Sequence, residues 1–240
     1  MIWLQHWTDV LFLHFAVRED ELESLLPPQL EIDSFAGQAW VSFVFFRLKL
    51  RSAGLPHIPG LSSLREMNVR TYVRHRGRGG IYFLRMYADN WLAIRAARLL
   101  TPLNYELATM LDCPRSDLPR HVECRSSGDR RGFLRAEFTA PHGAEEAAAA
   151  SLDFWLVERY RLFVDTRDGA ILAGDVEHPP WQASAVRVLA VEHDFGRALG
   201  LKLEQRPAAA HFSAGVAARF NPFRVVAEPR SASRLVARHS

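Results

Sequence analysis

The sequence predicts one α+β domain, built mainly of antiparallel strands with a few short helices and closed or half-closed into a barrel. Three observations lead to this prediction. Apolar residues recur mostly with a period of two, the period of β-strands. Turn-forming residues separate the successive extended segments, as in a series of hairpins. No linker, repeat or break in composition divides the 240 residues.

The extended segments follow from this alternation. The first, residues 10–17, is apolar on both faces except for His14, which indicates a strand buried on both sides. Hairpin turns are expected at glycines that interrupt the pattern, within residues 36–37, 77–80, 128–131 and 168–169. The later strands are expected at residues 30–35, 39–50, 66–74, 81–88, 122–126, 133–139, 154–166, 170–177, 185–191, 201–205 and 211–220.

Two short helices interrupt the strands. Residues 18–26 begin with acidic side chains and end at two prolines, as a helix does. Residues 91–100 are amphipathic, with Asn90 as the expected N-cap and a proline beyond the end. Residues 52–63 are rich in glycine and proline and predict a loop. We expect one domain over residues 1–225 and a polar, frayed tail over residues 226–240.

Composition excludes several classes of protein. The formal net charge is +3, and only Lys49 and Lys202 are lysines among the 30 basic residues. The arginines are scattered, so no basic stripe indicates nucleic-acid binding. Two cysteines are too few for a disulfide framework or a four-ligand zinc site. No apolar run could span a bilayer and no signal peptide is recognisable, which predicts a cytoplasmic protein without membrane partners.

One strand carries a row of polar residues on a single face. Glu66, Asn68, Arg70 and Tyr72 alternate with apolar residues over residues 66–73. This row either faces solvent or lines a cavity, where it would be a binding site for a small molecule. The spacing alone favours the solvated face.

A second polar group follows an apolar run. Glu158 and Arg159, next to Tyr160, come directly after Phe-Trp-Leu-Val, so burial would require partners for their charges. Arg159 would find such a partner in Glu66, although a structural ion pair is an equally good interpretation. His14 is better explained as a hydrogen-bonded core residue than as a ligand. No spacing of histidine or cysteine indicates a metal, and no motif indicates a nucleotide or other cofactor.

Several motifs together resemble a known family. The residues that carry the resemblance are Leu11–Phe15, Leu25–Leu30, Phe35–Val41, Glu66–Val73, Ala97–Arg98, Leu103–Tyr105, Glu158–Tyr160, His178–Trp181 and His211–Ser213. Their order resembles the YqjF-like family of uncharacterised proteins (domain of unknown function 2071), and the Glu-x-Asn-Val-Arg-Thr-Tyr-Val string is its most specific element. That family is similar to the acetoacetate decarboxylase superfamily. The resemblance implies a cone-shaped β-barrel around a small-molecule pocket, with the polar row lining it.

The resemblance fails where decarboxylase chemistry requires a lysine. Those enzymes carry a Pro-Lys-Lys-Leu-Ala-like string, whose lysine forms a Schiff base with a keto acid. The matching residues here read Asn-Tyr-Glu-Leu-Ala, at residues 104–108. Neither Lys49 nor Lys202 lies in a comparable place. Schiff-base decarboxylation is therefore not expected.

Three functions follow from these residues. In the first, a pocket holds an organic or keto acid: Arg70 or Arg159 binds its carboxylate, Glu66 is the candidate acid or base, and Tyr105 or Tyr72 donates to an oxyanion. The second is a non-catalytic sensor on the same barrel, and the third is a protein-interaction module. Whether the protein is an enzyme stays open. A homodimer is expected only on the general ground that large β-domains often pair. The ligand-lining residues expected are Asn68, Arg70, Tyr72, Glu158, Arg159 and His14.

Overall fold

The computed structural model describes residues 3–52, 63–113, 119–128, 132–139 and 146–229. Within these ranges the chain is mostly strand, with four short helices, and no helix there is long and apolar enough to cross a membrane. The strands are β1 (Trp3–Val17), β2 (Glu31–Ile32), β3 (Ala39–Ser52), β4 (Ser63–His75), β5 (Arg78–Ala88), β6 (Tyr105–Cys113), β7 (Arg120–Ser126), β8 (Phe133–Phe138), β9 (Arg161–Asp165), β10 (Ile171–Glu177), β11 (Ala183–Ala185), β12 (Val188–His193), β13 (Ala209–Phe220) and β14 (Arg224–Ala227). The helices are α1 (Glu19–Glu23), α2 (Trp91–Leu100), α3 (Leu152–Val157) and α4 (Phe195–Leu199).

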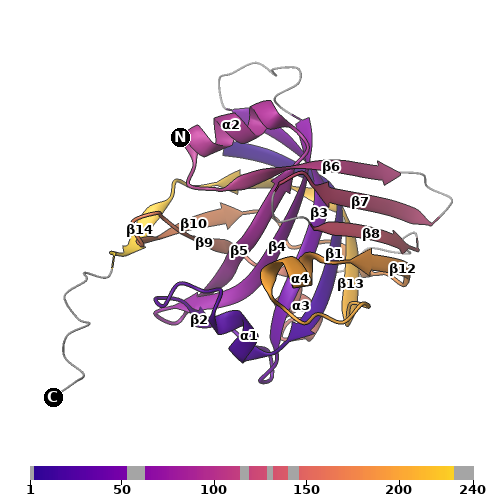
Figure 1. The fold of residues 1–240 in the computed structure, drawn as a ribbon, viewed down its shortest axis with the longest axis horizontal. Coiled ribbons are helices and arrows are strands. Elements are labelled where there is room, and N and C mark those ends of the chain that lie inside the picture. The colour runs from indigo at the N-terminus through magenta and orange to yellow at the C-terminus, as the bar shows by residue number, and fades with distance from the viewer. Residues whose placement is uncertain (1–2, 53–62, 114–118, 129–131, 140–145, 230–240) are drawn as a thin grey trace.

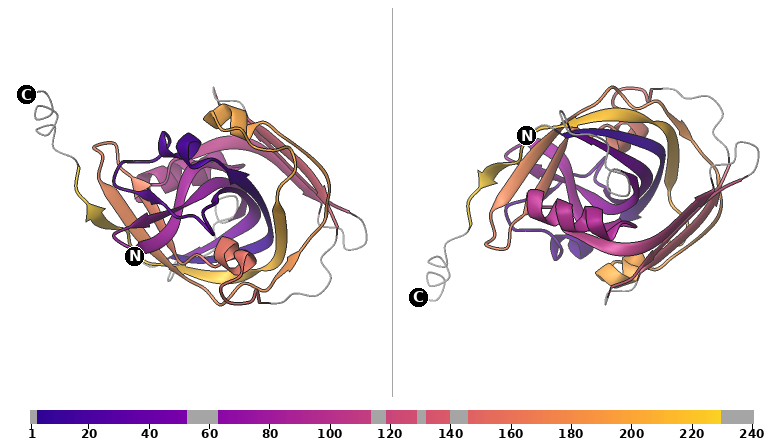
Figure 2. Two further views of the ribbon diagram at one scale, coloured as in Figure 1. Left: turned by 90° about the horizontal axis from the view of Figure 1, so that it is seen from below. Right: turned by 90° about the horizontal axis from the view of Figure 1, so that it is seen from above.

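Seven strands form a closed ring, which Figure 2 shows from its two ends. Neighbours pair in the order β5, β9, β10, β13, β1, β3, β4 and back to β5. β6, β7, β8 and β12 continue from β5 as an array outside the ring (Figure 1). Residues 81–82 of β5 pair with β9 and residues 86–88 pair with β6, both in parallel. All other strand pairs are antiparallel in the described chain, so the sheet is mixed but mainly antiparallel, as predicted.

Two hydrophobic cores lie on the two sides of the ring wall. On β3, Val41, Phe43 and Phe45 face the core between the ring and the outer array. The alternate residues Val44 and Phe46 face the core inside the ring. A strand between two cores needs apolar side chains on both faces, which explains why residues 39–50 are apolar almost throughout.

The central hairpin and the second helix agree with the sequence prediction. β4 and β5 are joined by the turn that contains Gly77, whose φ of +74° suits glycine. α2 covers residues 91–100, and Asn90 caps it by accepting hydrogen bonds from two backbone N–H groups at 3.1 Å.

The prediction of one strand over residues 154–166 is wrong in its first part. Residues 152–157 form α3, and β9 begins only at Arg161. The Ser151 hydroxyl caps the helix by accepting a hydrogen bond from the N–H of Phe154 at 3.1 Å. A short apolar run suits either a strand or a buried helical turn, so periodicity could not separate the two.

One expected strand pairing and one expected strand are also wrong. β2 pairs with β4, with Glu31 opposite Arg74, and only a single bridge joins Phe35 to Gln38 across the expected hairpin. The expected strand 185–191 is two elements, β11 paired with β13 and β12 paired with β8. Partner choice depends on where the sheet closes, which local sequence does not specify.

The remaining differences concern short segments. No strand forms over residues 201–205, which follow helix α4, a helix that was not predicted. Gly200, with φ +77°, ends that helix, and the N–H of Leu201 donates to the carbonyl of Gly196. β6 and β14 were also not predicted, and β14 continues to Ala227 within the expected tail. Residues 53–62 of the expected loop, 129–131 of an expected turn and 230–240 of the tail lie outside the described residues.

Candidate functional site

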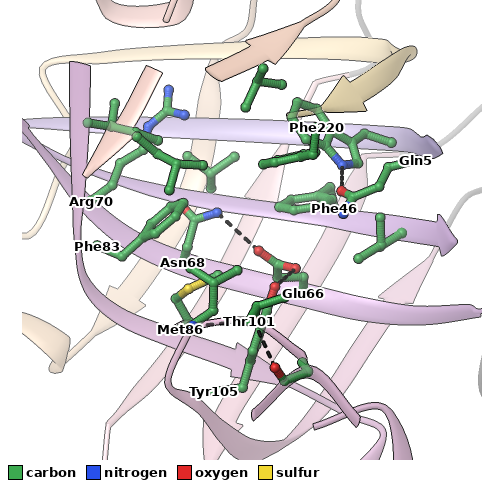
Figure 3. A pocket seen from close by; sticks show the side chains of 18 of the residues that line it. Gln5, Phe46, Glu66, Asn68, Arg70, Phe83, Met86, Thr101, Tyr105 and Phe220 are labelled. Carbon is green, nitrogen blue, oxygen red and sulfur yellow. Dashed lines mark hydrogen bonds between the residues drawn. The ribbon is translucent and has the colours of Figure 1, made fainter. Parts of the chain in front are cut away.

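The ring encloses a cavity of about 920 Å³. Inward-facing side chains of β1, β3, β4 and β5 form its walls, α2 covers one end, and most of the lining is apolar (Figure 3). Ligand pockets typically measure about 300–1,000 Å³, so this cavity lies near the upper end of that range. It is large enough to hold a small molecule completely.

Three residues of the predicted polar row line this cavity. Glu66, Asn68 and Arg70 lie on the inner face of β4, while Met67 and Val69 between them face the outer core (Figure 3). The three polar residues are 4%, 4% and 8% exposed. The preference for a solvated face is therefore wrong, because the outer array buries the apolar face and the ring encloses the polar one.

Glu66 and Tyr105 form a hydrogen-bonded pair at the α2 end of the cavity. Tyr105 Oη donates to Glu66 Oε2 at 3.0 Å, and Asn68 Nδ2 lies 3.5 Å from Glu66 Oε1 (Figure 3). Burial raises the pKa of Glu66 to about 7, although these two hydrogen bonds oppose the change. Burial and the adjacent carboxylate raise the pKa of Tyr105, so its hydroxyl is a lasting donor. Glu66 can therefore take up or release a proton near neutral pH.

Arg70 is a buried cation without a carboxylate partner within 4 Å among the described residues. Its Nη2 donates to the carbonyl oxygen of Leu156 in α3 at 3.2 Å. Its guanidinium carbon lies 5.5 Å from the ring centre of Phe12. Arg70 Nε is buried and has no hydrogen-bond partner in the described structure. This geometry leaves the guanidinium available to an anion inside the cavity.

Arg159 also lines the cavity, but the structure gives it a different partner from the expected Glu66. Its Nη1 lies 3.1 Å from Oδ2 of Asp33, which is 2% exposed. The guanidinium carbon lies 4.2 Å from the ring centre of Trp155 and 5.0 Å from that of Tyr72. Arg159 Nε and Nη2 are buried without hydrogen-bond partners in the described part of the chain. Arg159 is thus held by an ion pair and by aromatic rings while two of its donors are unused.

Tyr72 and His14 lie behind the cavity and not among the residues that line it. The hydroxyl of Tyr72 donates to the carbonyl of Leu156 at 2.9 Å and lies 2.6 Å from Ser42 Oγ. His14 Nδ1 lies 2.7 Å from the same Ser42 oxygen. Burial lowers the pKa of His14 well below its usual value, so the ring is neutral. This network connects β1, β3 and β4 with α3.

Glu158 likewise lies outside the main cavity. Its carboxylate accepts hydrogen bonds from the N–H of Trp181 at 2.7 Å and from Tyr160 Oη at 2.5 Å. Trp181 does line the cavity, so Glu158 positions part of the wall. The sequence brought Glu158 and Arg159 together as neighbours, but the structure separates their roles.

Two parts of the lining were not predicted from the sequence. Arg161 lines the cavity and pairs with Asp175 at 2.7 Å. Ala93, Ile94 and Ala97 of α2 form a wall of mostly small side chains over one end. Their i, i+1, i+4 spacing on an amphipathic helix was the sequence signal for this wall, but it shows only that this face of the helix packs against another part of the protein.

The residues that line the cavity include more arginines than carboxyl groups. The described lining holds three arginines and a single carboxyl group, that of Glu66. It contains no lysine, serine or cysteine in the part of the chain that the structure describes; Lys49 and Lys202 are both exposed. No group of three or more possible ligand side chains is placed to hold a metal among the described residues. Arg159 and Arg161 are paired with Asp33 and Asp175, so Arg70 is the lining arginine that has no carboxylate partner among the described residues.

The fold belongs to the acetoacetate decarboxylase-like class. An acetoacetate decarboxylase structure is 18% identical, covers 96% of this chain and 91% of its own, and superposes with a TM-score of 0.66. The enduracididine biosynthesis enzyme MppR complexed with pyruvate is 14% identical, with 96% and 92% of the two chains covered and a TM-score of 0.66. An acetoacetate decarboxylase-like enzyme from Sphingomonas wittichii RW1 is 11% identical, with coverage of 95% and 93% and the same TM-score.

The particular family within this class is that of domain of unknown function 2071, described as an uncharacterised conserved protein. Its model matches residues 4–217, and the chain belongs to this family. The uncharacterised protein YqjF of Bacillus subtilis (strain 168) is 40% identical over 185 residues, which are 75% of each chain.

Proposed function

We propose that the cavity binds an organic acid or a carbonyl compound. The observation that carries this proposal is Arg70: a guanidinium that lines an apolar cavity, is 8% exposed and has no carboxylate beside it in the described structure. A buried charge without a counter-ion is costly, and a carboxylate ligand would offset that cost with a pair of parallel hydrogen bonds. Arg159, with two unused donors, supports the same type of ligand.

The chemistry differs from Schiff-base decarboxylation. Such a route needs a lysine in the cavity, and both lysines of this chain lie on the surface. At the place where the resemblance puts two lysines, Tyr105 donates to Glu66 and Glu106 lies 3.7 Å from Arg85. A complex of MppR with pyruvate indicates that the fold can hold a keto acid, which supports the ligand class and no particular reaction.

If the protein is an enzyme, Glu66 and Tyr105 are its acid–base pair. Glu66 titrates near neutral pH because it is buried, and Tyr105 is a fixed donor to an oxygen that develops negative charge. No described lining residue is a lysine, serine or cysteine nucleophile. This observation favours the second candidate, a sensor that binds the same ligand without turnover.

The test is a thermal-shift screen of the purified protein against carboxylic and keto acids at millimolar concentration. A ligand present at about 100 times its dissociation constant adds about 2.7 kcal/mol to the free energy of unfolding and raises the melting temperature. Arg70→Met removes the guanidinium and should abolish the shift, whereas Arg135→Met on the exposed outer array should retain it. Product analysis of the incubated hit then separates an enzyme from a sensor. The proposal fails if no acid or carbonyl compound shifts the wild type, or if Arg70→Met responds like the wild type.

A further inference from the structure

The volume and lining of the cavity exceed what a three- or four-carbon acid needs. A cavity of about 150 Å³ already holds benzene, whereas this one measures about 920 Å³. Phe46, Leu48, Phe83, Met86 and Ile94 are among the apolar side chains that form most of its wall. A short acid bound at Arg70 would leave most of this apolar surface in contact with water, so it would gain little from the hydrophobic effect.

The polar groups are also far apart. Arg70 and Glu66 are four residues apart on one strand, which places their Cα atoms roughly 13 Å apart. Arg70 contacts Leu156 of α3, while Tyr105, the partner of Glu66, accepts a hydrogen bond at its carbonyl from Arg98 of α2 at 3.1 Å. The polar row therefore runs along the cavity from the α3 end to the α2 end, and Figure 3 shows Arg70, Asn68 and Glu66 in this order.

Between these ends lies Asn68, whose Oδ1 is buried without a hydrogen-bond partner in the described chain. An unpaired buried acceptor is costly, and a hydroxyl on the ligand would satisfy it. In a keto acid of three or four carbons, the carbonyl lies too close to the carboxylate to reach Glu66, at the far end of the row, while the carboxylate contacts Arg70.

We propose that the ligand is an elongated, largely apolar carboxylic acid. Its carboxylate binds Arg70, its chain follows the cavity toward α2, and it carries a hydroxyl group remote from the carboxylate, opposite Asn68 and Glu66. This inference rests on the proposed function, since it specifies which acid the same cavity takes.

The end of the cavity at α2 suits such a chain. Ala93 and Ala97 leave room along the inner face of the helix. Leu100 lines the cavity and is also 61% exposed, so among the described residues the cavity opens beside it. An apolar chain would meet an apolar surface along this route.

The experiment is a calorimetric titration of the full chain with butyrate, hexanoate, octanoate, decanoate and a set of monohydroxydecanoates. Affinity should rise about fourfold for each added methylene, which corresponds to about 0.8 kcal/mol. One hydroxydecanoate should bind about 3–10-fold tighter than decanoate. Asn68→Leu should remove that gain, and Ala97→Phe, which fills the α2 end, should weaken decanoate while leaving butyrate unchanged.

The outcomes separate this inference from the proposed function. If pyruvate, acetoacetate or butyrate binds as tightly as decanoate in an Arg70-dependent way, the proposal of an elongated ligand is wrong, and the proposal of an organic-acid site is retained. If affinity rises with chain length but no hydroxydecanoate binds more tightly than decanoate, the proposal of a remote hydroxyl group is wrong. If no acid of any length binds, or if binding ignores Arg70→Met, both proposals fail.

Discussion

Replacing Arg70 with methionine tests whether this residue serves binding or stability. Methionine has a similar length but no charge, so the change removes the guanidinium without opening a large space. In the wild type, the only hydrogen bond described for Arg70 goes to the carbonyl of Leu156. That carbonyl also accepts from the hydroxyl of Tyr72 at 2.9 Å, so the substitution does not leave it unpaired.

The expected change in stability is small because none of the carboxylates that the structure describes loses its partner. The lost hydrogen bond from a charged donor is worth about 1.5–3 kcal/mol, and the contact with Phe12 adds a fraction of that. Relief from burying an unpaired cation offsets this loss by a similar amount. We therefore expect the free energy of unfolding to change by about 1 kcal/mol or less, or about 2–4 °C in melting temperature.

Arg159→Met is the matched comparison. Asp33, which is 2% exposed, would lose Arg159; among the described residues it would keep only Arg74, which is 49% exposed and lies 2.6 Å away. Breaking a buried ion pair costs about 3–5 kcal/mol, and the second arginine reduces this to about 2 kcal/mol.

Urea unfolding of the wild type and both variants at pH 7 measures these differences. A loss of 3–5 kcal/mol for Arg70→Met, with Arg159→Met nearly neutral, would refute this reasoning and make Arg70 a structural residue. Arg70→Met should also lose its response to acids while keeping its fold.

Three further predictions concern pH and packing. Burial raises the pKa of Glu66 from 4.5 to about 7, so between these pH values the folded protein binds more protons there than the unfolded chain, and stability falls as pH rises. The free energy of unfolding, measured with urea, should fall by up to about 3 kcal/mol between pH 4.5 and 7. Glu66→Gln should flatten that part of the stability profile. The lowered pKa of His14 has the opposite effect: the stability that its neutral ring contributes is present above pH 6.5 and is lost as pH falls below that value. His14→Gln should therefore reduce the loss of stability in acid. An unchanged loss of stability in acid would contradict this prediction. Gly80→Ala would place a Cβ 2.8 Å from the carbonyl oxygen of Arg161, where β5 meets β9, and should lower the free energy of unfolding by about 1–3 kcal/mol, seen as a lower melting temperature. Gly79→Ala, whose Cβ would lie 3.3 Å from an Asp33 oxygen, should have a clearly smaller effect. Equal effects of the two substitutions would refute close packing at this junction.

Local chemistry made much of the fold predictable. The N-cap at Asn90 and the boundaries of α2 follow from hydrogen bonding within a few residues. The β4–β5 hairpin follows from a two-residue period around a glycine turn. Residues 154–157 were misassigned because a four-residue apolar run has no diagnostic period. β6 was not predicted because its exposed face carries Leu107 and Leu111, which obscure the apolar–polar alternation of a strand.

The candidate site was predictable only in part. Alternation places Glu66, Asn68 and Arg70 on one face whatever the fold, yet spacing favoured solvent as their environment. The predicted partner of Arg159 was wrong because its actual partner, Asp33, is remote in sequence and approaches Arg159 only when β2 and β4 pair. Arg161 carried no local signal that would distinguish it from the other scattered arginines.

The sequence by itself determined which side chains of β4 share a face, where α2 begins and where the β4–β5 turn occurs, because these depend on bonds and contacts between near neighbours. Only the tertiary structure decided that the polar face of β4 is enclosed, that Glu66 meets Tyr105 and that no described carboxylate lies beside Arg70. These properties arise when β5 pairs with both β4 and β9 and closes the ring. Ring closure changes the surroundings of the polar row from water to an apolar cavity, and burial then raises the pKa of Glu66 and leaves a guanidinium without a partner among the described residues.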